Sequence, residues 1–585
     1  MKKISLNVAV LLVAGTFVIN GCSPLKKMEK NAGKVNYTVV PEVLETHAGK
    51  VDATIQSQYP ANYFAKKVTL TITPVLKYAG GEKAYSSYVL QGEKVKANNK
   101  VIPLAAGGSN SFKGSLPYGV EMLRSDLELR VKASQGSKSL DFKPVIIAKG
   151  VIATSTLVDN SPLAILGVRL KANTTGIYDP TIDKYQRIVP DAYMADLVYL
   201  INSSEVRTKE LSKAEIEHLN KYIAEAYNAE NKELKGVDVS AYASPDGKLD
   251  LNSKLAGKRE GSASGVVDNS LKKNKVKTDI TSRNTPEDWE GFKALMEKSN
   301  IQDKDLILRV LAMYSDPEVR EREIKNLSSA FTKVADEILP QLRRAKITAS
   351  VNLIGRTDAE ISRLAESDPS KLSQAELLYA ATLTNEASKQ KAIYSSFTKI
   401  YASDWRGFNN LGYVEMNDGD FAAAAGNFQK ADQLDPKNAI VQNNLGCVAL
   451  KNGDWAKAEE LFGAASGAGK EVRENLGILK IKQGDYDTAV KYLDENSTSY
   501  ANRGLAQLLS GDNNGALKTL NAAPSESGRI AYLKAIVFAR TGKPSQMYES
   551  LVNAIKKDPA YSTIAQNDLE FAKYANDQNF KLLFK

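Results

Sequence analysis

Residues 237–260 read VDVSAYASPDGKLDLNSKLAGKRE, and this stretch sets the fold class of the middle of the chain. Apolar and polar residues alternate over 237–241, which predicts a short β-strand, and the Ser-Pro-Asp-Gly sequence at 244–247 is typical of a turn. After the turn, three residues recur at a spacing that places them on one side of a helix: Asn252, Leu255 and Arg259. The stretch therefore predicts a strand, a turn and a helix in succession.

Strand and helix patterns continue on both sides of this stretch. Residues 197–201 (LVYLI) predict another strand, Ser212 is a suitable N-cap for a helix over 213–228, and residues 346–353 predict a last strand. Helical patterns between 285 and 347 predict an inserted helical region. Together these patterns predict an α/β domain with a helical insertion.

The spacing of Gly247, Asn252 and Arg259 resembles the motif of the OmpA-like C-terminal domain, a periplasmic module that binds peptidoglycan. The resemblance implies that Arg259 pairs with the carboxylate of a diaminopimelate residue, for which a planar guanidinium is suited. The aspartate of the family falls at Ser244, whose hydroxyl cannot pair with an ammonium group, and Asp246 stands two residues away. The resemblance implies that residues 195–355 are a divergent OmpA-like domain with a partly changed site. Its candidate peptidoglycan-binding residues are Ser244, Asp246, Asn252 and Arg259.

The first residues predict export and lipidation. Lys2 and Lys3 precede an apolar run over 8–19, which is too short to span a bilayer and is typical of a signal peptide. The run ends in Ile-Asn-Gly-Cys at 19–22, which resembles a bacterial lipobox. That resemblance implies cleavage after residue 21 and acylation of Cys22, which becomes the first mature residue. The alternative is an ordinary secretory signal with an incidental cysteine.

The residues after Cys22 predict the subcellular location of the chain. Ser23 stands where an aspartate would favour retention in the inner membrane, and no acidic cluster follows that would favour surface display. The chain is therefore expected to be an outer-membrane lipoprotein on the periplasmic face, held in the membrane lipid by Cys22 through a tether at 22–34.

Length and composition fit several globular domains. A chain of 585 residues is too long for one core, and 43% hydrophobic with 25% charged residues is ordinary for folded protein. The net charge of +10 comes from basic residues dispersed among acidic ones, which argues against a nucleic-acid partner.

No pattern in the sequence indicates an enzyme, a metal site or a cofactor. Cys447 is the only cysteine after Cys22 and lies in a helical pattern, which predicts a small packed thiol. His47 and His218 each stand alone, without a second ligand at metal-binding spacing. Phosphate-binding, serine-hydrolase and zinc-protease motifs are absent from the sequence.

The N-terminal third has a β pattern. Short alternating stretches over 35–155 are separated by Gly-Gly and Asn-Asn pairs, which predicts an antiparallel β-sandwich whose ligand the sequence does not indicate. Residues 156–194 are predicted to be a bridging region.

Beyond residue 356 the chain is helical and repetitive. Leu-Gly pairs at 411, 445 and 476 are each followed by a Gly-Asp-aromatic turn and then by an alanine. This pattern resembles the tetratricopeptide repeat and implies that 356–585 form an α-solenoid. Such a solenoid binds a peptide or partner in its concave groove. The candidate groove residues are Asn409, Tyr413, Asn443, Cys447, Asn475 and Lys482. For Asn409 and Asn443 a purely solvating role is equally consistent with the sequence.

The sequence as a whole predicts a multidomain α+β chain. Its leading function is a non-enzymatic scaffold of the cell envelope that docks partner proteins through the repeat array. The alternative is a peptidoglycan-binding anchor that uses the OmpA-like domain, and glycan binding by the sandwich is a weaker possibility.

Overall fold

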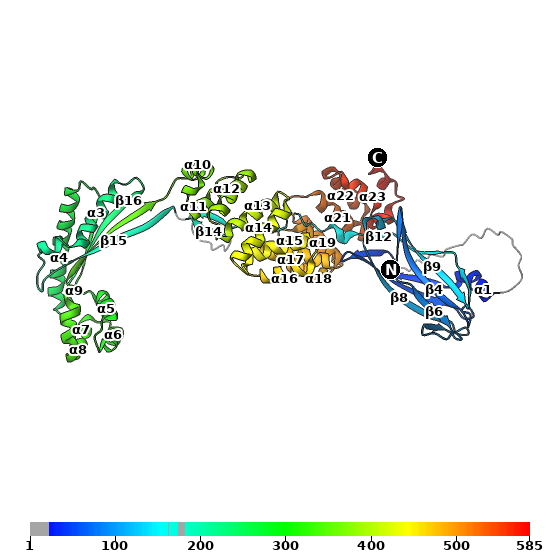
Figure 1. Ribbon diagram of the computed structural model, residues 1–585, viewed down its shortest axis with the longest axis horizontal. Coiled ribbons are helices and arrows are strands. Elements are labelled where there is room, and N and C mark those ends of the chain that lie inside the picture. The colour runs from blue at the N-terminus through cyan, green and yellow to red at the C-terminus, as the bar shows by residue number, and fades with distance from the viewer. Residues whose placement is uncertain (1–22, 162, 173–181, 186) are drawn as a thin grey trace. The chain divides into compact units, whose positions relative to one another are not determined.

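A computed structural model describes residues 23–161, 163–172, 182–185 and 187–585. The predicted signal peptide at 1–21 and the lipidation site at Cys22 lie outside these residues. The chain divides into two compact units, one made of residues up to Gly167 together with Ser403–Lys585 and the other of Val168–Ala402 (Figure 1). Among the described helices none has the length and apolar character that crossing a bilayer requires.

The N-terminal domain consists of two β-sheets that share one core. The first sheet contains β1 (Asn36–Val40), β3 (Lys50–Tyr59), β2 (Leu44–His47), β12 (Val151–Ile152) and β8 (Gly108–Pro117). The second contains β10 (Lys138–Asp141), β9 (Ser125–Gln135), β4 (Thr69–Tyr78), β6 (Tyr88–Gly92), β7 (Lys100–Ile102), β11 (Val145–Lys149) and β5 (Gly81–Ala84). The predicted β-rich domain is confirmed. The pairs β2–β12 and β6–β7 are parallel, so a wholly antiparallel sandwich was wrong at these two places.

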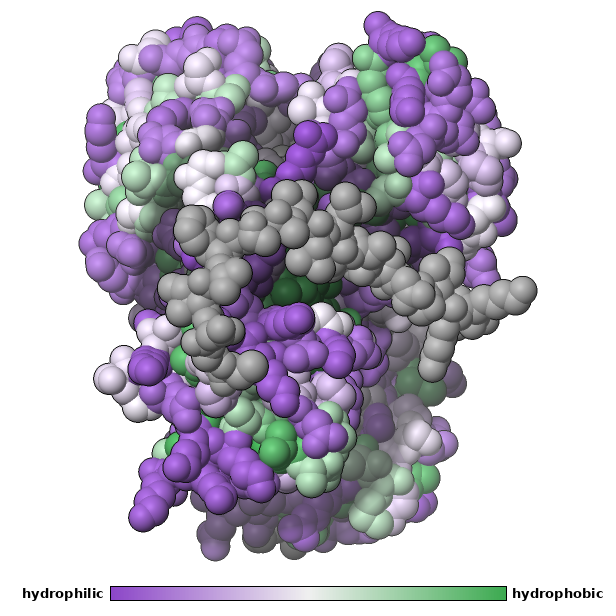
Figure 2. Space-filling model, turned by 90° about the vertical axis from the view of Figure 1, so that its right-hand side faces the viewer, coloured by the Kyte–Doolittle hydropathy of each residue, from purple (hydrophilic) through white to green (hydrophobic). Residues whose placement is uncertain are grey.

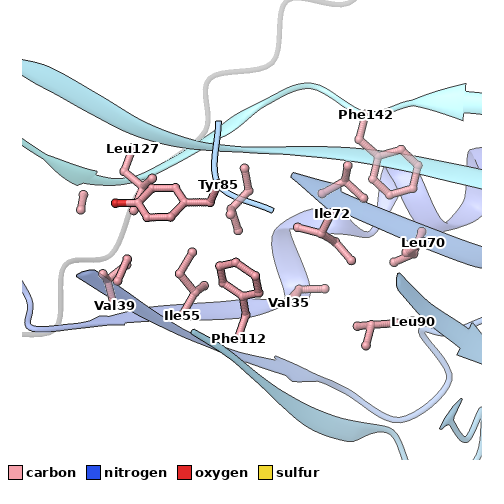
Figure 3. Close-up of a cluster of buried hydrophobic side chains, with 14 of the residues drawn as sticks. Val35, Val39, Ile55, Leu70, Ile72, Tyr85, Leu90, Phe112, Leu127 and Phe142 are labelled. Carbon is pink, nitrogen blue, oxygen red and sulfur yellow. The ribbon is translucent and has the colours of Figure 1, made fainter. Parts of the chain in front are cut away.

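Alternating residues of the strands fill the space between the sheets. In β3 every second residue is buried, as a strand with one wet face requires. Figure 3 shows Ile55 and Phe112 of the first sheet pointing toward Leu70, Ile72 and Leu127 of the second.

The segment predicted as a tether at 22–34 is helical over much of its described part, residues 23–34. Pro24–Lys30 form helix α1 and Ala32–Lys34 form the short helix η1. Leu25 and Met28 of α1 are buried in the core of the sandwich, because their apolar side chains fall on one face of the helix. The chain is thus folded against the sandwich from Ser23 onward.

The second unit contains a four-stranded sheet in the order β15 (Ile188–Val198), β18 (Arg344–Ile354), β16 (Lys232–Tyr242) and β17 (Ile280–Thr285). Helices α3 (Ala214–Asn228) and α4 (Leu249–Lys273) pack on one face of it. The predicted strand at 237, the helix after the turn and the last strand are all present. β15 begins at Ile188, well before the predicted strand at 197, because it pairs with β18 along its whole length.

Helices between β17 and β18 form the predicted insertion. They are α5 (Trp289–Lys298), α6 (Lys304–Met313), α7 (Pro317–Asn326), α8 (Ser328–Lys333), η4 (Val334–Ile338) and α9 (Leu339–Leu342). They share a small core around Phe292, Met296 and Leu342.

Three further helices belong to this unit: α10 (Asp358–Ser367), α11 (Gln374–Ala380) and α12 (Ala387–Ile400). Helix α11 packs against β13 (Arg169–Ala172) and β14 (Ile182–Tyr185), and Tyr379 stacks on Tyr185 with ring centroids 4.5 Å apart. The border between the units therefore falls at residue 403, later than the predicted border at 356.

The C-terminal array is built from antiparallel helix pairs. They are α13 (Trp405–Asn417) with α14 (Phe421–Leu434), α15 (Ala439–Lys451) with α16 (Trp455–Ala464), α17 (Lys470–Gln483) with α18 (Tyr486–Tyr492), α19 (Tyr500–Leu509) with α20 (Asn513–Asn521), and α21 (Gly528–Arg540) with α22 (Pro544–Lys557). Helix α23 (Ala560–Asn567), the 3-10 helix η7 (Leu569–Tyr574) and α24 (Gln578–Leu582) follow.

The repeated Leu-Gly and Gly-Asp pairs have separate packing roles. A Cβ at Gly446 would lie 2.6 Å from the ring of Phe462, so only glycine lets α15 approach α16 this closely. In the turn, Gly453 has a φ of +79°, which favours glycine, and Asp454 caps α16 by accepting a hydrogen bond from the Lys457 N–H. These two requirements explain why the pattern repeats along the array.

Candidate functional site

The inner face of the array carries a row of buried asparagines. One of them stands two residues before the packed glycine in each of four successive inner helices, α13, α15, α17 and α19. These four residues are Asn410, Asn444, Asn475 and Asn502, and all are at most 2% exposed. Asn409 and Asn443 stand one place earlier and are also fully buried. A buried amide needs hydrogen-bond partners, and for Asn444, Asn475 and Asn502 these partners lie in the groove.

The occupant of the groove is a segment of the same chain. Residues 157–161 and 163–167, here called the strap, leave the sandwich and lie along the inner helices. Leu163 and Leu166 of the strap are buried against the array. The strap therefore covers the concave face that was predicted to bind a partner.

Two asparagines bind the strap as a neighbouring β-strand would. The Ala164 N–H donates to Asn475 Oδ1 at 3.0 Å, and Asn475 Nδ2 donates to the Ala164 carbonyl at 2.8 Å. Asn444 makes the same pair with Leu166, at 2.8 Å and 2.7 Å. Since Ala164 and Leu166 are two residues apart, the same edge of an extended backbone is bound at both places.

The other end of the strap is held in the same way. Asn502 accepts from the Asp159 N–H at 2.7 Å and donates to the Asp159 carbonyl at 2.8 Å. Arg529 of α21 donates to the Leu157 carbonyl at 2.9 Å, and its guanidinium lies 3.6 Å from the Asp159 carboxylate. The row of contacts thus runs from α13 to α21.

Asn409 and Asn443 complete the network. Asn443 Nδ2 donates to the Ala164 carbonyl at 2.9 Å, and Asn409 Nδ2 donates to the Leu166 carbonyl at 3.0 Å. Each of these carbonyls therefore accepts two amide N–H groups. The interpretation of Asn409 and Asn443 as solvating residues is wrong, because both are buried under the strap.

The remaining predicted groove residues have different surroundings. Cys447 is fully buried with its Sγ 3.9 Å from the Ala164 carbonyl oxygen, and burial raises the pKa of its thiol, which stays protonated at neutral pH. A Cβ on Gly167 would lie 3.3 Å from the ring of Tyr413, so the strap passes close to that ring. Lys482 is half-buried, and burial followed by the charge of Lys451 lowers the pKa of its ammonium group.

The array also packs on the sandwich within the first unit. His47 Nδ1 lies 2.6 Å from Tyr486 Oη, and the Thr154 hydroxyl donates to Glu570 at 2.5 Å. Ser155 Oγ donates to the Thr46 carbonyl at 2.6 Å, so the residues that lead into the strap are themselves fixed on the sandwich.

In the second unit the predicted ligand-binding arginine is turned inward. Arg259 is 0% exposed, and its guanidinium donates to the carbonyls of Ser203, Tyr242 and Leu200 at 2.9, 2.8 and 3.2 Å. Burial lowers its pKa to about 10. The guanidinium also lies over the ring of Tyr199, 5.1 Å from its centroid. In this geometry Arg259 joins the loop after β15 to the end of β16 instead of facing a ligand.

The other three predicted residues lie in one polar network. Ser244 Oγ donates to Asp246, and Arg343 lies 3.4 Å from the Asp246 carboxylate and 3.3 Å from Ser244 Oγ. Asn252 Nδ2 bonds the carbonyls of Ser244 and Gly247 at 3.1 and 3.0 Å, which fixes the turn. Asp246, the expected substitute for the missing aspartate, is thus already paired with Arg343, which was not among the predicted site residues.

Over the part of the chain that the structure describes, no three His, Cys, Asp or Glu side chains come together as metal ligands do.

The tetratricopeptide repeat family matches residues 416–471, and the predicted tetratricopeptide array is confirmed. No match was found among curated proteins. Similar solved structures include a tetratricopeptide repeat protein from Parabacteroides merdae, at 12% identity over 45% of this chain and 96% of that chain, with a TM-score of 0.29. Another is YrrB, described as a TPR protein with an unusual peptide-binding site, at 20% identity over 29% and 96% with a TM-score of 0.25. A third is pilF of Pseudomonas aeruginosa, at 15% identity over 38% and 97% with a TM-score of 0.29.

Proposed function

We propose that the chain is a non-enzymatic scaffold of the cell envelope, whose array docks a partner protein by binding an extended segment in the groove that the strap occupies. The observation that carries this proposal is the set of three asparagine pairs, in which each side-chain amide bonds both the N–H and the C=O of one strap residue. These bonds involve only the main chain of the strap. Any extended segment of suitable shape can therefore replace it.

The groove also sets limits on that segment. Asn443, Asn475 and Cys447 all contact the main-chain carbonyl of Ala164, so they fix the backbone at this position. Leu163 and Leu166 are buried, so branched aliphatic side chains fit at these positions. The expected partner segment is extended, with aliphatic side chains at the positions of Leu163 and Leu166.

The site of action is part of the same proposal. The lipobox-like sequence at 19–22 supports acylation of Cys22, and Ser23 supports delivery to the periplasmic face of the outer membrane. Peptidoglycan attachment through Arg259 is not included, because its guanidinium is taken up by three main-chain carbonyls.

A disulfide that locks the strap tests the docking site. Ala164→Cys introduces a second thiol at the residue whose carbonyl oxygen lies 3.9 Å from Cys447 Sγ. Closure of the bond is verified by mass spectrometry without reductant. Partner recovery after crosslinking in cells is then compared between the oxidised and the reduced protein.

If the strap must leave the groove, the oxidised protein recovers no array-dependent partner and reduction restores it. Ala164→Cys combined with Cys447→Ala is the control, because it carries the same new side chain without a lock. Full recovery by the oxidised protein would show that partners use another face of the array.

A further inference from the structure

The sandwich has two ends, and the array covers one of them. At that end the hairpin between β2 and β3 carries Gly49, where a Cβ would lie 3.8 Å from the ring of Trp455. Arg124, just before β9, donates to the Gln566 carbonyl at 3.3 Å. Strands β3, β4 and β9 run from this end to the opposite one.

The strand pairing shows which segments share the opposite end. Thr69, the first residue of β4, pairs with Ser134 near the end of β9 and with Gln91 near the end of β6. Asn36 at the start of β1 pairs with Gln58 near the end of β3. Four segments therefore meet there: residues 23–35, 60–68, 92–99 and 135–138.

Helix α1 is fixed at this end. The Ala65 N–H lies 3.5 Å from Met28 Sδ, and Leu25 and Met28 are buried in the sandwich core. Ser23, which is bonded to Cys22, directly precedes the helix. A membrane anchor on residue 22 would therefore hold this end of the folded domain at the membrane surface, with a single residue between them.

Positive charge gathers at this end. The four segments contain nine lysines and only two acidic residues, Glu29 and Glu93. The lysines, all exposed, are Lys26, Lys27, Lys30, Lys34, Lys66, Lys67, Lys94, Lys96 and Lys138. Lys66 pairs with Glu93 at 2.8 Å and lowers the pKa of that carboxyl group. Figure 2 faces the side of the molecule where α1 lies, and hydrophilic residues cover most of the surface visible there.

We propose that this lysine-rich end of the sandwich is a membrane-contact surface that binds the headgroups of anionic phospholipids. Each lysine near an anionic surface contributes about 1 kcal/mol, equivalent to about a fivefold change in partition. A membrane anchor on residue 22 would bring this same lysine-rich face to the membrane. A lipid surface is therefore a better occupant than an acidic protein. The surface would orient the sandwich, with the array on the side away from the bilayer.

The test uses the chain from residue 22 onward with Cys22→Ser, so that no acyl chain contributes. We expect it to sediment with vesicles that contain phosphatidylglycerol and not with vesicles of phosphatidylcholine alone. Binding should be lost at about 1 M salt, where the Debye length is about 3 Å. The triple variant Lys26→Gln, Lys27→Gln and Lys67→Gln should bind about a hundredfold more weakly.

A matched control removes three exposed lysines from the end of α4 and the loop after it: Lys272→Gln, Lys273→Gln and Lys277→Gln. It should bind within about twofold of the parent chain. A second variant, Lys94→Gln with Lys96→Gln, tests the same surface without changing α1. Absence of binding to the phosphatidylglycerol vesicles, or equal losses in test and control variants, would refute the proposal. The vesicle assay contains neither the acyl chain nor a partner protein. Its result is therefore independent of the docking function proposed for the array.

Discussion

Ala164 and Asn475 exchange two hydrogen bonds across the groove of the array, with the strap N–H donating at 3.0 Å and the asparagine amide donating at 2.8 Å. An asparagine side chain thus does for one residue of the strap what a neighbouring β-strand would do. The array holds its own chain by this means at three separate positions.

Asn475→Ala should loosen the strap and destabilise the first unit. The change leaves the partly buried Ala164 N–H without its acceptor, at a cost of about 1–3 kcal/mol. We expect a lower urea midpoint and faster proteolytic cleavage within the strap. Asn228→Ala is the control, since Asn228 is exposed in the other unit and its loss should change stability by at most about 0.5 kcal/mol. Unchanged cleavage of the strap would show that the Asn475 pair does not hold it.

Gly446→Ala should destabilise the array by about 1–3 kcal/mol, because the new methyl group would lie 2.6 Å from the ring of Phe462. Gly463 provides a matched control in the partner helix, where a Cβ would meet no atom within 4 Å. Gly463→Ala should stabilise the array by up to about 1 kcal/mol, since alanine favours a helix. Thermal unfolding of the two variants should shift in opposite directions.

Asp568 should make the stability of the array depend on pH. Burial raises the pKa of its carboxyl group from 3.8 to about 6, although Tyr532 and the Glu570 N–H both donate to it. An acid whose pKa is higher in the folded state binds more protons when folded, so its contribution to the free energy of unfolding falls as pH rises from about 4 to 6.

Asp568→Asn removes this titrating group, keeps Oδ1 as the acceptor for the Glu570 N–H, and places an NH2 group that can donate to the Tyr532 hydroxyl oxygen. Urea unfolding measured between pH 4 and 7 should show that the advantage of the variant over the parent grows with pH and levels off above about pH 6, with a total change of about 1–3 kcal/mol. A constant difference between the two proteins over this range would contradict the raised pKa.

Arg259→Lys should destabilise the second unit. A lysine keeps the positive charge but cannot reach the carbonyls of Leu200, Ser203 and Tyr242 together as the guanidinium does, so we expect a loss of about 2–4 kcal/mol from unsatisfied buried acceptors. Hydrogen exchange of β15 and β16 measures the effect. Retention of the variant on purified sacculi separates a structural role from a binding role. A variant that stays folded but is no longer retained would show that Arg259 binds peptidoglycan.

The elements of the repeats could be predicted from sequence because each has a local cause. Gly453 is required by its positive φ and Asp454 by the first turn of α16, so the pair recurs wherever that turn recurs. The alternation in β3 likewise follows from having one buried face.

The occupied groove could not be predicted in the same way. The asparagines bind main-chain atoms, and the main chain of the strap has no sequence signature. The sequence does contain one signal for the asparagine row. Asn444, Asn475 and Asn502 each stand two residues before the packed glycine, although only Asn475 was among the predicted groove residues. The role of Arg259 was missed because its partners are carbonyls of a loop and a strand end distant in sequence.

The course of the chain past the strap has a mechanical consequence. The polypeptide leaves the first unit directly after Gly167 and returns to it at Ser403, just before α13. Asn409 of α13 donates to the carbonyl of Leu166. The strap, where the chain leaves the unit, is thus bonded to the first helix after the chain returns. A pull on the chain beyond Gly167 would therefore act on the asparagine pairs of the strap before it reached the sandwich.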